Sequence, residues 1–208
     1  MKLKKKAKRI ILILVIVFIA TIGILFYLKN SKKDEPVKET KIVNEVENFE
    51  YKLKENKPKK YKEMFEELKE ILTKEQIDED AYVRKISEMF IYDFYSLNDK
   101  TAKTDIGGVD FVYNEVLENF LQNAQNTYYK YVESNIYNNR KQSLPVVSEI
   151  SIDNVEQKAF AYGDKNDESA FYVTASWSYT DDQFQTYQRK ATLVFIHDGN
   201  KLSLVELQ

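Results

Sequence analysis

The first 28 residues combine a basic start with a long apolar run. Residues 1–9 carry six Lys or Arg, and residues 10–28, "IILILVIVFIATIGILFYL", contain no charged side chain. As a helix, this run would be about 28 Å long, close to the hydrocarbon thickness of a bilayer. Because a helix that is apolar on every side is typical of a membrane span, we expect residues 10–28 to form a transmembrane helix in contact with lipid.

This segment is either an uncleaved anchor or a cleaved signal peptide. A signal peptide usually has a shorter apolar region, followed by a cleavage site with small residues. Here the run ends in the bulky residues Phe26, Tyr27 and Leu28, which favours an anchor. Six basic residues precede the run and three follow it closely. The positive-inside rule therefore predicts a single-pass protein of the cell membrane, with a cytoplasmic N-terminus and an extracytoplasmic C-terminal domain.

Residues 29–40 are polar and are predicted to be a linker, and helical periodicity follows over residues 41–76. Two apolar stripes with steps of three and four residues are separated by Pro58: Ile42, Val46, Phe49 and Leu53, then Tyr61, Phe65, Leu68 and Leu72. These helices are either a coiled-coil stalk or helices that pack against the chain's own domain. Since fewer than three heptads are present, the second interpretation is favoured.

The domain predicted at residues 77–208 begins with two more helices. The first starts at Thr73 or Asp78, and the second starts after Asp110 and runs to about residue 137. Three Asp residues lie in or beside the turn-rich segment between the helices, but their spacing does not match that of an EF-hand calcium loop. We therefore expect a solvated loop, in which Asp110 caps the second helix.

After Pro145 the apolar period changes from 3.6 to 2, which indicates β-strands. "VSEISID" and "KAFAY" predict two short strands, and "GDKNDES" predicts a loop. "AFYVTASWSYT" alternates most clearly, with one face made of Phe171, Val173, Ala175, Trp177 and Tyr179. The last two strands flank Asp198-Gly199, a dipeptide typical of type I′ hairpin turns. The predicted fold class is α+β, with helices on one face of an antiparallel sheet of about four strands.

Charge and composition exclude several classes of function. Residues 1–33 hold nine basic and no acidic side chains, so the remainder, with 22 basic and 33 acidic, has a net charge of −11. An acidic body repels phosphate backbones, which argues against nucleic-acid binding. No cysteine is present, so disulfides and thiol nucleophiles are excluded. The chain also lacks the G-x-S-x-G, H-E-x-x-H and P-loop motifs. We predict no catalytic, cofactor-binding or metal-ligating residues and no cofactor.

The only histidine, His197, stands directly before Asp198. In a catalytic pair, the carboxylate normally orients the imidazole from another part of the fold. Because Asp198 belongs to the predicted turn, we interpret the pair as the polar corner of the last hairpin and not as a catalytic site.

The order of helices followed by a meander resembles the NTF2-like (cystatin-like) superfamily, above all over residues 175–207, "ASWSYTDDQFQTYQRKATLVFIHDGNKLSLVEL". Members of that superfamily pack helices into the concave face of a strongly curved sheet. They often carry a Trp shortly after the Gly of the last turn, where this chain has Leu202. A cytoplasmic tail, one span and an outer NTF2-like domain are similar in layout to the VirB8-type and TcpC-type components of conjugation and secretion machines. That resemblance implies assembly without catalysis.

We therefore expect a non-catalytic interaction or assembly protein of a bacterial cell envelope, which binds envelope proteins or itself. One alternative is a small-molecule or peptide-binding domain, in which Tyr and Phe line the cone between helices and sheet. An NTF2-like enzyme is a further alternative. A cavity lined by a buried carboxylate would favour these alternatives over the assembly role.

Overall fold

The computed structural model describes Thr21 and residues 40–208. The basic tail at 1–9, the membrane span predicted at 10–28 and the linker at 29–40 therefore lie outside the described residues, apart from Thr21 and Thr40. Within the described part of the chain, no helix has the length and apolar character needed to cross a membrane.

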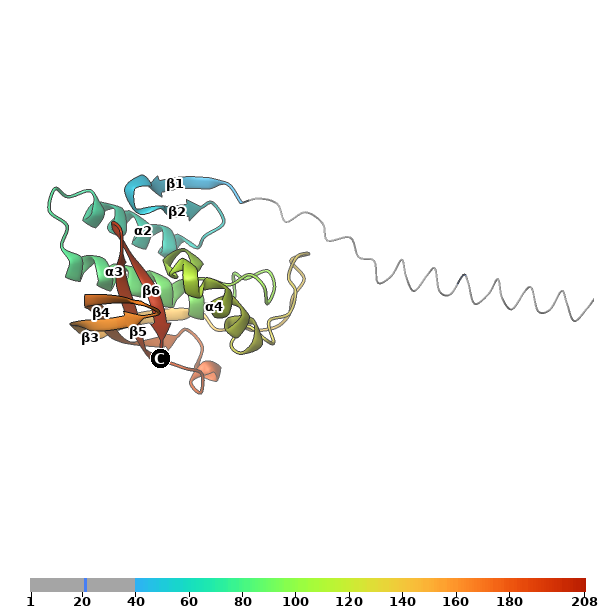
Figure 1. Ribbon diagram of the computed structural model, residues 1–208. Helices are drawn as coiled ribbons and strands as arrows, with labels where there is room; N and C mark the ends of the chain where they lie inside the picture. Colours follow the sequence, from blue (N-terminus) through green and yellow to red (C-terminus); the bar gives the residue numbers. More distant parts are fainter. Residues whose placement is uncertain (1–20, 22–39) are drawn as a thin grey trace, which may run out of the picture. The chain divides into compact units, whose positions relative to one another are not determined.

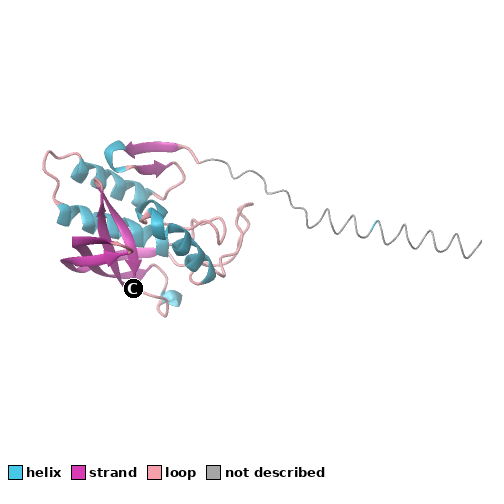
Figure 2. Cartoon of the chain, in the orientation of Figure 1, coloured by secondary structure: helices cyan, strands magenta, loops and turns pink. Residues whose placement is uncertain are grey.

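Residues 40–208 have an α+β fold built on a curved antiparallel sheet (Figure 1). The order in the sheet is β3-β4-β5-β6, and all neighbours are antiparallel. The predicted fold class and the predicted meander are confirmed at this level. The four strands are β3 (Val147–Tyr162), β4 (Lys165–Tyr179), β5 (Lys190–Asp198) and β6 (Lys201–Leu207). The helices are α2 (Lys59–Leu72), α3 (Glu79–Tyr95) and α4 (Asn114–Asn126) (Figure 2).

The core lies between α3, α4 and one face of the sheet. The alternation in β4 is confirmed, since its five inward-facing residues from Phe171 to Tyr179 are buried. The ring of Tyr95 on α3 lies 4.2 Å from that of Trp177 on β4. The ring of Phe94 lies 5.3 Å from that of Phe120 and 5.9 Å from that of Tyr128. Aromatic side chains therefore fill much of the space under the curved sheet.

The helix predicted for the first apolar stripe is wrong. These residues form an antiparallel hairpin of β1 (Ile42–Val46) and β2 (Tyr51–Lys54), joined by the 3-10 turn η1 (Glu47–Phe49). Glu50 follows the turn with a φ of 56°, and in β2 buried side chains alternate with lysines. In β2 the apolar residues thus follow a period of two, and strand pairing overrides the helical stripe.

The hairpin packs against the helices, and it does not form a stalk. The side-chain amide of Asn44 donates to Glu66 on α2 at 2.7 Å, and the Phe49 ring lies 5.8 Å from the Tyr82 ring on α3. Of residues 41–76, only the second stripe, on α2, is α-helical. The hairpin and α2 belong to the same folded unit as the rest of residues 40–208.

The helix boundaries partly follow the sequence. α3 begins after Asp78, one of the two predicted starts, and the Asp78 carboxylate accepts the Ala81 N–H at 3.0 Å. α4 begins at Asn114 and ends at Asn126, so the predicted cap at Asp110 and the predicted end near residue 137 are wrong. Asp110 lies in the 3-10 turn η2 (Val109–Phe111).

The early end of α4 has a tertiary cause. Tyr129 is fully buried, and its hydroxyl donates to the Phe94 carbonyl at 2.7 Å and accepts the Gly107 N–H at 3.0 Å. The chain turns at Thr127, whose backbone N–H still bonds to the Asn123 carbonyl. Burial of the Tyr129 side chain therefore ends α4 before the predicted end of the helix.

Two details of the sheet also differ from the prediction. The two short strands predicted after Pro145 are one strand, β3, and the predicted loop shrinks to a turn at Gly163, whose φ is 60°. The exposed end of the β3–β4 hairpin is rich in polar residues, so the sequence shows no alternation of apolar and polar residues there. The last hairpin is confirmed, but Asp198 pairs with Lys201, so the turn residues are Gly199 and Asn200. Of these two, only Gly199 has a positive φ, which excludes type I′.

Candidate functional site

His197 pairs with a carboxylate from a neighbouring strand. Its Nδ1 lies 2.9 Å from Asp167 Oδ2, and the same oxygen accepts the His197 backbone N–H at 2.7 Å. Asp167 lies on β4, beyond Phe171, the last β4 residue paired with β5. Burial acts to raise the Asp167 pKa, but the hydrogen bonds from His197 hold it below its ordinary value. Asp167 therefore bonds a backbone N–H that the ladder leaves unpaired, and it also orients the imidazole.

The orienting carboxylate was missed in the sequence because Asp167 falls in the segment predicted as a loop. Asp198, the sequence neighbour, instead accepts the Ser203 hydroxyl at 3.2 Å. Because Asp167 accepts from Nδ1–H, the neutral ring presents Nε2 as a hydrogen-bond acceptor. This Nε2 lies 3.6 Å from Glu79 Oε1, at the start of α3.

A cleft of about 660 Å³ lies beside His197, between the β5–β6 turn, the end of α2 and the start of α3. Its apolar lining comes from Phe49, Leu72, Ile77 and Leu202, and its polar lining includes Asn48, Glu79, Asn200 and Lys201. None of these lining residues offers a Ser, Thr or Cys nucleophile to the imidazole.

Tyr82 lies at the inner side of this cleft and is held by the surrounding strands. Its hydroxyl lies 2.7 Å from that of Tyr51 and accepts the Leu202 N–H at 3.1 Å. Burial raises the pKa of Tyr82 to about 12, so the phenol stays protonated at neutral pH. The hydroxyl is occupied by the hydrogen bonds that join β2, α3 and β6.

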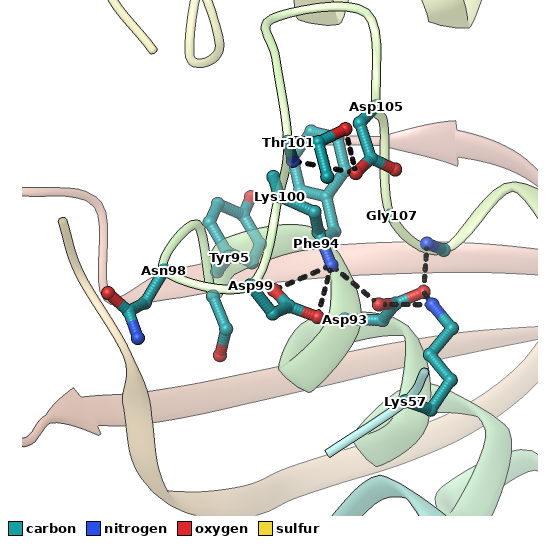
Figure 3. A network of polar contacts seen from close by, with 12 residues as sticks. Lys57, Asp93, Phe94, Tyr95, Asn98, Asp99, Lys100, Thr101, Asp105 and Gly107 are labelled. Atoms are coloured by element: carbon teal, nitrogen blue, oxygen red, sulfur yellow. Dashed lines mark hydrogen bonds and ion pairs between the residues drawn. The ribbon is translucent and has the colours of Figure 1, made fainter. Parts of the chain in front are cut away.

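A buried ion-pair network lies at the other end of α3 (Figure 3). The carboxylate of Asp93 accepts from Lys57 Nζ at 2.6 Å, Lys100 Nζ at 2.8 Å and the Gly108 N–H at 2.8 Å. Burial acts to raise the Asp93 pKa, but the two ammonium groups hold it well below its usual range. Lys100 also pairs with Asp99 at 3.0 Å. The network therefore ties the residues after β2, the helix α3 and the loop after it to one buried charge.

Residues 127–146, which we call the aromatic loop, extend from the body of the domain (Figure 1). Three large side chains in this loop face solvent: Tyr131 is 74% exposed, Ile136 is 61% exposed and Tyr137 is 70% exposed. Large apolar and aromatic side chains that are exposed together are typical of a surface that binds a partner.

The aromatic loop is held by specific polar bonds. The Arg140 guanidinium donates to the carbonyls of Lys100 and Asn98, both at 2.8 Å. The Asn135 N–H donates to the Thr101 carbonyl at 2.7 Å. The aromatic loop is thus bonded to the backbone on either side of Lys100, whose side chain reaches Asp93. The exposed side chains are presented on a structured loop that is connected to the buried network.

A second cavity, of about 370 Å³, lies between α4 and β6, under the curved sheet. Its lining is mainly apolar and includes Phe94, Tyr95, Val116, Phe120, Tyr128 and Leu204. The single carboxylate in the lining, that of Glu206, is partly exposed. A buried acid is not among the lining residues of this cavity.

Comparisons of the chain with models of known protein families, with curated proteins and with solved structures found no match. The NTF2-like resemblance therefore stays a prediction.

Proposed function

We propose that this protein is a membrane-anchored, non-catalytic interaction or assembly protein of a bacterial cell envelope. Residues 10–28 would contact membrane lipid, and the folded unit 40–208 would lie outside the cell membrane. The observation that carries the proposal is the aromatic loop, which carries three exposed apolar or aromatic side chains and is bonded to the neighbouring backbone through Arg140 and Asn135. Tyrosines of this kind bury a large apolar area and keep a hydroxyl for hydrogen bonding when a partner binds.

The partners proposed are other envelope proteins or further copies of the chain. The net charge of −11 beyond residue 33 argues against nucleic acid. A layout of tail, single span and NTF2-like outer domain, in the VirB8-type or TcpC-type manner, is consistent with this role. The sequence pattern and the α+β fold class support this proposal.

Photo-crosslinking in cells tests the role of the aromatic loop. With p-benzoylphenylalanine at position 137 or 131, we expect ultraviolet light to give adducts of higher mass in membranes, because these side chains would touch the partner. The same probe at Gln157, an exposed position on β3, is the matched control and should give few adducts. Recovery of monomer alone from the native cells at both loop positions would contradict the assembly role.

The proposed orientation makes a separate prediction. A cysteine added after Gln208 would be the only thiol in the chain, since the sequence contains no cysteine. We expect a membrane-impermeant maleimide to label it on intact cells, because the C-terminal unit would lie outside. A cysteine inserted after Met1 is the control and should be labelled only after lysis. The opposite labelling pattern would refute the orientation.

Small-molecule binding is the second candidate function, and the apolar cavity of about 370 Å³ between α4 and β6 favours it. Its volume lies within the range of known ligand pockets. An enzyme is less well supported, because the cavity lining offers no buried carboxylate to act as an acid or base.

A further inference from the structure

The cleft beside His197 is lined in part by Lys201, a lysine without a direct ion-pair partner among residues 40–208. Lys201 lies in this cleft, and among residues 40–208 no carboxylate oxygen lies within 4.0 Å of its ammonium group. The Nζ atom instead lies 4.8 Å from the centre of the Tyr51 ring. Burial lowers the Lys201 pKa, and the more distant charges of Asp110, Glu50 and Asp198 oppose this shift. A partly buried ammonium group of this kind would be stabilised by an anion that enters the cleft.

Two hydrogen-bond acceptors lie elsewhere in the same cleft. Asp167 holds the Nδ1 side of the His197 ring, so Nε2 of the neutral imidazole accepts. Glu79 Oε1 lies 3.6 Å from this Nε2. A neutral imidazole that donates from Nδ1 has no N–H at Nε2, so His197 Nε2 and Glu79 Oε1 cannot hydrogen-bond to each other. A ligand group with several N–H donors, such as an ammonium group, would bond to both.

Part of the remaining lining of the cleft is apolar, and Asn48 and Asn200 add polar groups to it. Phe49 and Leu202 are buried, and Leu72 and Ile77 complete this surface. An apolar group of a ligand would be removed from water here, which contributes to binding in proportion to the buried area. The cleft therefore offers a cation, a pair of acceptors and an apolar surface.

We propose that this cleft binds a small zwitterion with an apolar substituent, the chemistry of an apolar α-amino acid. The carboxylate of the ligand pairs with Lys201, its ammonium group lies between His197 Nε2 and Glu79, and its side chain packs on Phe49 and Ile77. Asp167 is a positioning residue, because it orients His197 without touching the ligand. This site is separate from the aromatic loop and does not depend on the assembly role.

The single histidine makes the test direct. In the full chain in detergent micelles, the imidazole signals in a ¹H–¹³C spectrum report on His197 alone, since the chain holds one His. The probes are leucine, 4-methylpentanoate, which lacks the amine, and isoamylamine, which lacks the carboxylate. We expect leucine at roughly millimolar concentration to shift the His197 signals. Each single-charge analogue should bind about tenfold more weakly or worse, because a hydrogen bond to a charged group is lost.

Two variants assign the charged groups of the cleft to the groups of the ligand. In Lys201→Gln, leucine should bind no better than isoamylamine, because the partner of the carboxylate is gone. In Glu79→Gln, the advantage of leucine over 4-methylpentanoate should fall. Lys190→Gln, at an exposed lysine on β5 outside the cleft, is the matched control and should leave all three affinities unchanged. The fluorescence of the buried Trp177 verifies the fold of each variant.

Two outcomes would overturn the proposal. One is the absence of any His197 shift with leucine in the unaltered chain. The other is equal affinity for leucine and its two single-charge analogues, which would show that the cleft takes an apolar group only. Glycine, which has no side chain, should bind more weakly than leucine, and equal binding would remove the apolar surface from the proposal.

Discussion

Asp93→Asn is expected to lower the free energy of unfolding by about 3–5 kcal/mol, as is typical when one partner of a buried ion pair is removed. The substitution keeps the shape of the side chain but leaves Lys100, which is 3% exposed, with only Asp99 as a partner. It also leaves the partly buried ammonium group of Lys57 unpaired. Urea unfolding of the full chain in detergent micelles, followed by Trp177 fluorescence, measures the effect.

The control for this prediction is Asp99→Asn. Asp99 pairs with the same Lys100 but is partly exposed, so its loss should cost less than about 1 kcal/mol. Equal effects of the two substitutions would contradict a special role for the buried carboxylate.

Acid pH should have a related effect. The Asp93 pKa in the folded protein lies below its ordinary value of about 4, so the ion pairs stabilise the fold fully above that value. This contribution is lost as the pH falls below it, and Asp93→Asn should therefore reduce the loss of stability in acid. An unchanged acid dependence in the variant would contradict the assignment.

Gly107→Ala is expected to lower the free energy of unfolding by about 3 kcal/mol, at the upper end of the usual cost of overpacking. A Cβ atom on Gly107 would overlap the backbone carbonyl oxygen of Asp93, and the helix that carries this carbonyl does not move easily. Gly108, the next residue, bonds to the Asp93 side chain, so the substitution would also push the loop away from the buried network. Urea unfolding again gives the measurement.

Gly163→Ala is the matched control for Gly107→Ala. A Cβ atom at Gly163 would meet nothing within 4 Å, so only its left-handed backbone, with a φ of 60°, opposes a side chain. That strain costs about 1–2 kcal/mol. If Gly163→Ala is as harmful as Gly107→Ala, steric overlap with Asp93 is not the cause.

Regular alternation and helical stripes predicted the elements that pack one face on the core. The strand from Phe171 to Tyr179 and the helix after Asp78 follow their patterns, since one side of each is buried. The hairpin at residues 42–54 was missed because its apolar residues have the spacing of a helical stripe, while its strands are formed by pairing with each other. The end of α4 at Asn126 depends on Tyr129 packing against Phe94 and Gly107, a contact between distant segments that no local pattern contains.

The candidate sites were harder to predict than the fold. The interpretation of His197 and Asp198 as a hairpin corner describes Asp198 well, because that residue pairs with Lys201 beside the turn. The partner of His197 is Asp167, on a strand whose polar sequence resembled a loop. Asp93 and Lys100 are seven residues apart, on a helix and the loop after it, and their burial depends on how that loop returns to Gly108.

The two edges of the sheet restrict how a partner can dock. The pairing of β3, one edge strand, with β4 has three register irregularities, which bend a strand and hinder the addition of another. At the other edge, the Tyr113 N–H occupies the Leu204 carbonyl of β6 at 2.8 Å. Recognition by strand addition is therefore disfavoured at both edges. Under the proposed assembly role, recognition through the side chains of the aromatic loop would make specificity depend on its individual residues, and this specificity would not be shared by every peptide that can form a strand.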